Sequence, residues 1–167
     1  MIKYFKYMEN KKSLSTIMFA VALLLFVCAI FAMFGKVIAV NDGGPIPNMF
    51  QAAFGTSTPG ADGIRTKGLT TVFIFQMIIT AGVIAILVGA ITNKFHYILM
   101  IVLYGVVCLC AFITFIVSFN TLGNYLSSGH SYRPGATLGV GPIIYSIMHI
   151  LGLLLSAGGL VLSRRGK

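Results

Sequence analysis

The sequence predicts an all-α integral membrane protein: a four-transmembrane-helix (tetraspan) antiparallel bundle with two extracytoplasmic loops. Composition is the first observation, since 57% of the 167 residues are apolar or aromatic and 9% are charged. A soluble domain has about 25% charged residues, so this chain has too few to cover a water-facing surface. The second observation is that four long segments carry no charge, and the third is that basic residues gather at their ends. Together these features exclude soluble enzymes and nucleic-acid-binding domains.

The four uncharged segments are long enough to cross a membrane. About 20 apolar residues suffice, because each adds about 1.5 Å to a path of about 30 Å. The segments are residues 14–35, 69–91, 97–119 and 140–162. We therefore expect one membrane domain over residues 1–167. The first segment is longer than the apolar core of a signal peptide, about 7–15 residues, so we expect it to be kept as a span.

The basic residues predict how the spans are oriented. Eight of the twelve fall in the leader 1–13, the short connection 92–96 and the tail 163–167, whereas four fall in the loops 36–68 and 120–138. Because positive loops stay in the cytoplasm, we expect both termini inside and both long loops outside. The net charge of +9 thus reflects topology. We expect a multi-pass protein of the plasma (inner) membrane, and the absence of cysteine and of glycosylation sequons from the outer loops favours a bacterial cell.

The leader and the outer loops carry weaker local patterns. The leader alternates lysines with aromatics, which is typical either of a short helix lying on the anionic inner leaflet or of a frayed tail. Residues 37–40 can extend the first helix or begin a strand, and residues 48–54 predict a short helix. Exposed aromatics with an arginine are typical of a recognition surface. The outer-loop recognition candidates are Phe50, Phe54, Tyr125, Tyr132 and Arg133. The alternative is that they anchor helix ends at the membrane interface.

Small and polar residues form seams along the helices. On the fourth span they recur at alternating spacings of four and three, which places them on one face. Small side chains let membrane helices approach closely, so we interpret these faces as packing seams rather than the lining of a pore or pocket. The predicted seam residues are Tyr145, His149, Gly152, Ser156 and Gly159 on the fourth span and Ala81, Ala85 and Gly89 on the second.

The spans lack the residues that membrane chemistry requires. They contain no Asp or Glu, which proton-coupled carriers usually keep at mid-membrane. The three histidines fall at three different depths and cannot share one metal ion, so we expect no catalytic, cofactor or metal site. His149 is expected to be neutral and to bond to Gln76, Thr80 or a backbone carbonyl, because a buried polar group needs a partner.

These observations predict a non-enzymatic tetraspan protein that acts by association, either as a self-assembling protein or as an accessory subunit of a membrane complex. Its expected partners are the lipid bilayer and a second copy or another membrane protein, with no nucleic acid. One alternative is a small oligomeric channel or facilitator without an intramembrane carboxylate. The other is a membrane enzyme acting on lipid headgroups through His130, the neighbouring Ser127 and Ser128, and Arg133.

Overall fold

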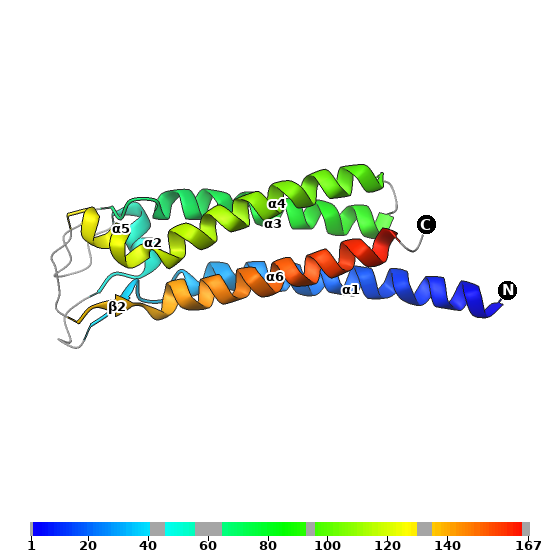
Figure 1. Ribbon diagram of the computed structural model, residues 1–167, viewed down its shortest axis with the longest axis horizontal. Coiled ribbons are helices and arrows are strands. Elements are labelled where there is room, and N and C mark those ends of the chain that lie inside the picture. The colour runs from blue at the N-terminus through cyan, green and yellow to red at the C-terminus, as the bar shows by residue number, and fades with distance from the viewer. Residues whose placement is uncertain (1, 41–45, 56–64, 93–95, 130–134, 165–167) are drawn as a thin grey trace.

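The computed structural model describes residues 2–40, 46–55, 65–92, 96–129 and 135–164, with side chains from residue 13 to residue 163. Four long helices lie side by side along one axis (Figure 1). They are α1 (Ile2–Ala32), α3 (Leu69–Thr92), α4 (Tyr97–Phe119) and α6 (Val140–Arg164). All four contain a stretch long and apolar enough to cross a membrane, so the predicted all-α chain with four such helices is confirmed.

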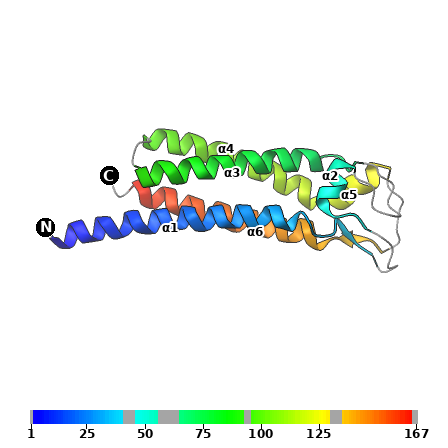
Figure 2. The same cartoon turned by 180° about the vertical axis from the view of Figure 1, so that it is seen from behind.

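The helices pack as a ring in which each has two neighbours. The α1 helix packs against α6 and α3, and α4 packs against α3 and α6. Figures 1 and 2 show α1 and α4 running toward the end that carries the short elements, while α3 and α6 run away from it. The N-terminal part of α1 extends beyond the other helices at the opposite end. Since α1 begins at Ile2, the backbone of the leader continues the first span as one helix.

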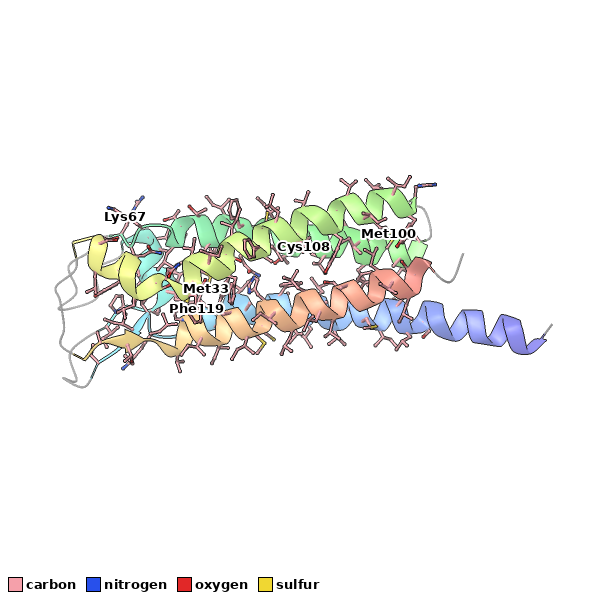
Figure 3. The ribbon with its side chains drawn as sticks, in the orientation of Figure 1. Met33, Lys67, Met100, Cys108 and Phe119 are labelled. Carbon is pink, nitrogen blue, oxygen red and sulfur yellow. The ribbon has the colours of Figure 1, made fainter. Side chains whose placement is uncertain are left out.

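Short elements gather at one end of the bundle. They are β1 (Ile38–Ala39), α2 (Met49–Phe54), α5 (Thr121–Ser127) and β2 (Thr137–Leu138). We call this region the cap and define it as residues 33–40, 46–55, 65–68, 120–129 and 135–139. Figure 3 places Met33, Lys67 and Phe119 toward the capped end and Met100 toward the end where the chain termini lie. Hereafter the two ends are the capped end and the termini end.

Hydrogen bonds join the two long loops within the cap. Strand β1 comes from the first loop and pairs antiparallel with β2 from the second, in the register Ile38 to Leu138 and Ala39 to Thr137. The Lys67 N–H donates to Ser128 Oγ at 2.7 Å and adds a second link. Residues 37–40, for which the sequence allowed either helix or strand, thus contain a strand. The cap is a single structure formed jointly by both loops.

Helix α2 is short, but both of its ends are satisfied. Asn48 Oδ1 accepts from the Gln51 N–H at 2.7 Å, and Gln51 Oε1 accepts from the Asn48 N–H at 3.0 Å, which is a capping box. At the other end Gly55 adopts φ 71°, a left-handed conformation that glycine reaches without strain. The predicted short helix at residues 48–54 is therefore present as α2.

The carbonyls at the end of α2 are bonded to the start of the next segment. Ala52 O accepts from the Thr66 N–H at 2.8 Å, and Ala53 O accepts from Thr70 Oγ1 at 2.6 Å. Phe54 O accepts from Arg65 Nε at 3.2 Å. These bonds fix α2 onto the first turn of α3 and leave few backbone groups of this short helix unpaired.

Two apolar clusters form the interior. One lies beneath the cap and combines residues of α1, α2 and α3 with Tyr125 and Tyr145. The other occupies the half toward the termini end. It contains Phe19, Ala22, Phe26, Ile79, Val83, Ile86, Met100, Val107, Cys110 and Ala111. The outward faces of the four helices are also apolar, as expected where lipid rather than water surrounds the helices.

Candidate functional site

The closest helix contact lies between α1 and α6, where phenylalanines fit against glycines. A Cβ added to Gly152 would lie 2.8 Å from Phe26 Cζ, and one added to Gly159 would lie 3.1 Å from Phe19 Cε1. Both pairs are spaced by seven residues, so the antiparallel helices repeat the same contact two turns apart. Glycine is required here because any side chain would displace the ring.

The backbones themselves approach near the capped end of this interface. A Cβ on Gly35 would lie 2.7 Å from Gly141 Cα, which leaves no room for a side chain. At the opposite end Ser15 Oγ donates to Gly159 O at 2.7 Å. Small residues therefore hold α1 against α6 along most of their length, as in other membrane helix pairs.

The predicted seam residues on α6 and on α3 differ in how deeply they are buried. All five on α6, namely Tyr145, His149, Gly152, Ser156 and Gly159, are buried inside the chain. On α3, Gly89 is buried, Ala85 is half-buried and Ala81 is exposed. The α6 seam is occupied by α1 and α4 of the same chain, so it offers no surface to a second copy. The sequence did not reveal Phe19 and Phe26, the residues that fill it, because they look like lipid-facing side chains.

A hydrogen-bonded polar centre links three helices in the capped half. Tyr145 Oη donates to Gln76 Oε1 at 2.8 Å, and Gln76 Nε2 donates to Phe26 O at 2.7 Å. Gln76 is seven residues into α3 and Tyr145 five residues into α6, which places both about 8–11 Å from the capped ends of their helices. Both side chains are fully buried. This pair ties α6 to α3 and, through Phe26, to α1.

His149 lies next to this centre and bonds within its own helix. Its Nδ1 is 2.9 Å from Tyr145 O, so Nδ1 carries the hydrogen and donates, because a carbonyl can only accept. Of the three partners expected for His149, a backbone carbonyl is the one found, and Gln76 bonds to Tyr145 instead. The imidazole packs 4.2 Å from the Tyr145 ring and 5.4 Å from the Phe26 ring, centre to centre. It is 1% exposed.

Three buried polar atoms have no hydrogen-bond partner among the residues that the structure describes. They are Ser118 Oγ, Ser146 Oγ and His149 Nε2. Other hydroxyls on the same helices bond back to their own backbone, as Thr114 does to Ala111 O at 2.9 Å and Ser156 does to Gly152 O at 2.8 Å. Ser118 and Ser146 depart from this pattern.

Aromatic rings connect the cap to the helices below it. Phe50 stacks on Phe34 at 5.9 Å between ring centres, and Phe54 meets Phe73 edge-on at 5.2 Å. Phe50 and Phe54 are 4.8 Å apart and half-buried. Phe34 is 60% exposed and forms the open edge of this cluster. The two recognition candidates of the first loop thus also hold α2 on α3 and on Phe34, which follows α1.

The candidates of the second loop are placed differently. Tyr125 is 4% exposed and belongs to the apolar cluster beneath the cap, so its ring is covered by the chain itself. Tyr132 and Arg133 lie outside the described residues. A helical period on α5 would have indicated that Tyr125 points inward, but seven residues were too few for that signal to be read from the sequence.

The described part of the cap exposes positive charge. Lys36, Arg65 and Lys67 are all exposed, and no Asp or Glu occurs in the cap residues that the structure describes. Within the described ranges there is also no group of three or more His, Cys, Asp or Glu side chains that could hold a metal ion. Cys28, Cys108 and Cys110 are free thiols within the long helices. The described part of the cap therefore presents exposed positive charges.

No protein family, curated protein or solved structure matches this chain. Its function is therefore inferred from the geometry of the cap and of the polar centre.

Proposed function

We propose that this chain is a non-enzymatic tetraspan membrane protein that acts by association and presents its cap to a partner outside the cytoplasm. The observation that carries the proposal is the joint construction of the cap. Two loops far apart in the sequence pair through β1 and β2, and a capping box and an aromatic cluster fix α2 onto the helices. A preorganised surface loses less conformational entropy on binding than a flexible loop does.

The proposed orientation places the cap in the extracytoplasmic space and both termini in the cytoplasm of a plasma (inner) membrane. Eight of the twelve basic residues fall in the leader 1–13, the connection 92–96 and the tail 163–167, four fall in the two long loops, and cytoplasmic segments carry the excess of Lys and Arg. The positive face of the cap favours a partner with exposed carboxylates. That partner is either another membrane protein, for which this chain is an accessory subunit, or a second copy.

The interior argues against a pore within one chain. Large apolar side chains, including Phe19, Phe26 and Ile86, fill the bundle toward the termini end. Water and ions would have no continuous polar path through this layer. A channel or facilitator would need a path between several chains, and no contact among the described residues favours that arrangement over simple association.

The test is a charge reversal on the cap. Lys36→Glu with Lys67→Glu reverses two exposed positive charges, and the bond from Lys67 to Ser128 uses the backbone N–H rather than the ammonium group. Lys94→Glu, in the sequence between α3 and α4, is the matched control. Cross-linking in native membranes followed by mass analysis would measure association. We expect cross-linked species to be lost in the cap variant and kept in the control, whereas equal cross-linking in both would refute a role for the cap.

A further inference from the structure

The three unpartnered groups lie on two adjacent helices in the capped half of the bundle. Ser118 is at the capped end of α4, and Ser146 and His149 are six and nine residues into α6. Helices α4 and α6 pack against each other. The exposed fractions of these residues are 0%, 5% and 1%, so bulk solvent does not reach them. Buried polar groups are nearly always bonded, if not to protein then to ordered water.

The protonation of the His149 ring restricts which molecules can form a hydrogen bond with Nε2. Because Nδ1 donates to Tyr145 O, Nε2 of the neutral ring offers a lone pair and requires a hydrogen-bond donor. A halide ion offers none, and any anion would need compensating charge at this depth. A metal ion or an organic cation would need compensating charge, and the spans contain no carboxylate. The two serine hydroxyls can both donate and accept. A small neutral molecule that also does both matches His149 and Ser146, which lie three residues apart on α6. Ser118 lies about 12 Å farther toward the capped end than His149 and is a separate position.

We propose that the capped half of the bundle contains an internal water-binding site on α6, in which bound water donates to His149 Nε2 and bonds to the hydroxyl of Ser146, three residues earlier on the same helix. The apolar layer from Phe19 to Ile86 bounds the site toward the termini end. The rings of Tyr145 and Phe26 pack against the imidazole, and Tyr145 is itself bonded to Gln76. The proposal does not depend on association through the cap, and its failure would leave that proposal unaffected.

X-ray radiolysis of the wild-type protein in lipid nanodiscs tests the site directly. Bound water yields hydroxyl radicals that oxidise adjacent side chains, even where bulk solvent is excluded. Tyr145 and Phe19 are both fully buried, one beside the proposed water and the other in the apolar layer. With each rate normalised to the unfolded chain, we expect Tyr145 and His149 to be modified several-fold faster than Phe19. Modification of Tyr145, His149 and Phe19 at the same slow rate would overturn the proposal, because it would show that no water lies beside His149.

A substitution provides a second, independent readout. If water serves the Ser146 hydroxyl, Ser146→Ala loses those bonds and its thermal unfolding midpoint falls below that of the wild type. If the hydroxyl has no partner, removing it leaves the midpoint unchanged or raises it. Ser156→Ala is the matched control, because its hydroxyl bonds only to backbone carbonyls of its own helix. In the Ser146→Ala variant we also expect slower radiolytic oxidation of His149, and an unchanged rate would count against the site.

Discussion

Phe26 combines three contacts at the centre of the molecule. Its ring covers Gly152 and meets the His149 imidazole edge-on, and its carbonyl accepts the Gln76 amide. One residue thus positions α6 by its side chain and α3 by its backbone. At the residue scale the bundle depends on such specific fits, because lipid provides no hydrophobic force that would press helices together.

Replacement of Gly152 by leucine should separate α1 from α6. The new side chain would collide with the Phe26 ring, and overpacking of this kind costs about 1–3 kcal/mol. Gly105→Leu is the control, because a Cβ there meets nothing within 4 Å. A thiol-reactive fluorescent dye can follow unfolding, since Cys28, Cys108 and Cys110 are free. We expect a lower midpoint for Gly152→Leu alone; equal midpoints for both variants would contradict the close contact.

The bond between Tyr145 and Gln76 can be measured by a double-mutant cycle. Tyr145→Phe leaves Gln76 Oε1 without its donor, and Gln76→Leu leaves the phenol without its acceptor. Hydrogen bonds between membrane helices average about 0.6 kcal/mol and reach about 1.7 kcal/mol. We expect a coupling energy in this range, because both groups are fully buried. Additive effects of the two substitutions would show that the side chains do not interact.

At the scale of single elements, the cap shows how a six-residue helix is held. Helix α2 is too short to be stable alone, since isolated helices need about 12–15 residues even in favourable sequences. It persists because an N–H group of its first turn and its last carbonyls are bonded and because its rings pack on Phe34 and on α3. Its stability is therefore a property of its surroundings.

Removal of the capping residue should loosen α2 without affecting the spans. Asn48→Ala leaves the Gln51 N–H without its acceptor, and loss of such a cap typically costs about 0.5–2 kcal/mol. We expect faster amide hydrogen exchange at residues 49–54 and unchanged exchange in α3 and α4. Asn48→Asp keeps an acceptor and is expected to preserve the protection. Slow exchange in the alanine variant would show that the aromatic contacts alone hold the helix.

At the scale of the whole molecule, the two ends have different characters. The capped end carries the paired strands and the two short helices α2 and α5, whereas none of these four short elements lies at the termini end (Figure 1). Between them the interior changes from a polar centre to an apolar layer. The proposed orientation assigns these two different ends to opposite sides of the membrane.

Cysteine labelling in intact cells would test that orientation. Single cysteines replace Lys3, Arg65, Lys94 or Arg133 in a chain whose native cysteines are changed to alanine. We expect an impermeant maleimide to label positions 65 and 133 from outside and to leave positions 3 and 94 unlabelled until the membrane is opened, because positive loops are retained in the cytoplasm. The reverse pattern would place the cap in the cytoplasm and remove the proposed partner surface.

The sequence by itself determined the four long helices, the lengths of α3, α4 and α6, and the presence of α2, but not that α1 begins at Ile2. A helix in lipid must satisfy its backbone internally, so length and the absence of charge identify it without knowledge of its neighbours. The small-residue face of α6 was also visible, because a spacing of three and four needs only the local helical period.

The tertiary structure decided which residue meets which. Phe26 and Phe19 against the α6 glycines, Tyr145 bonded to Gln76, β1 paired with β2 and the burial of Tyr125 all join segments far apart in the chain. Hydropathy could not single them out, since lipid-facing side chains such as Leu24 and Phe31 are as apolar as the buried ones. Where the surroundings and the core are equally apolar, the inside of a bundle is determined by steric fit and hydrogen bonding between helices, and those depend on partners that a linear pattern does not name.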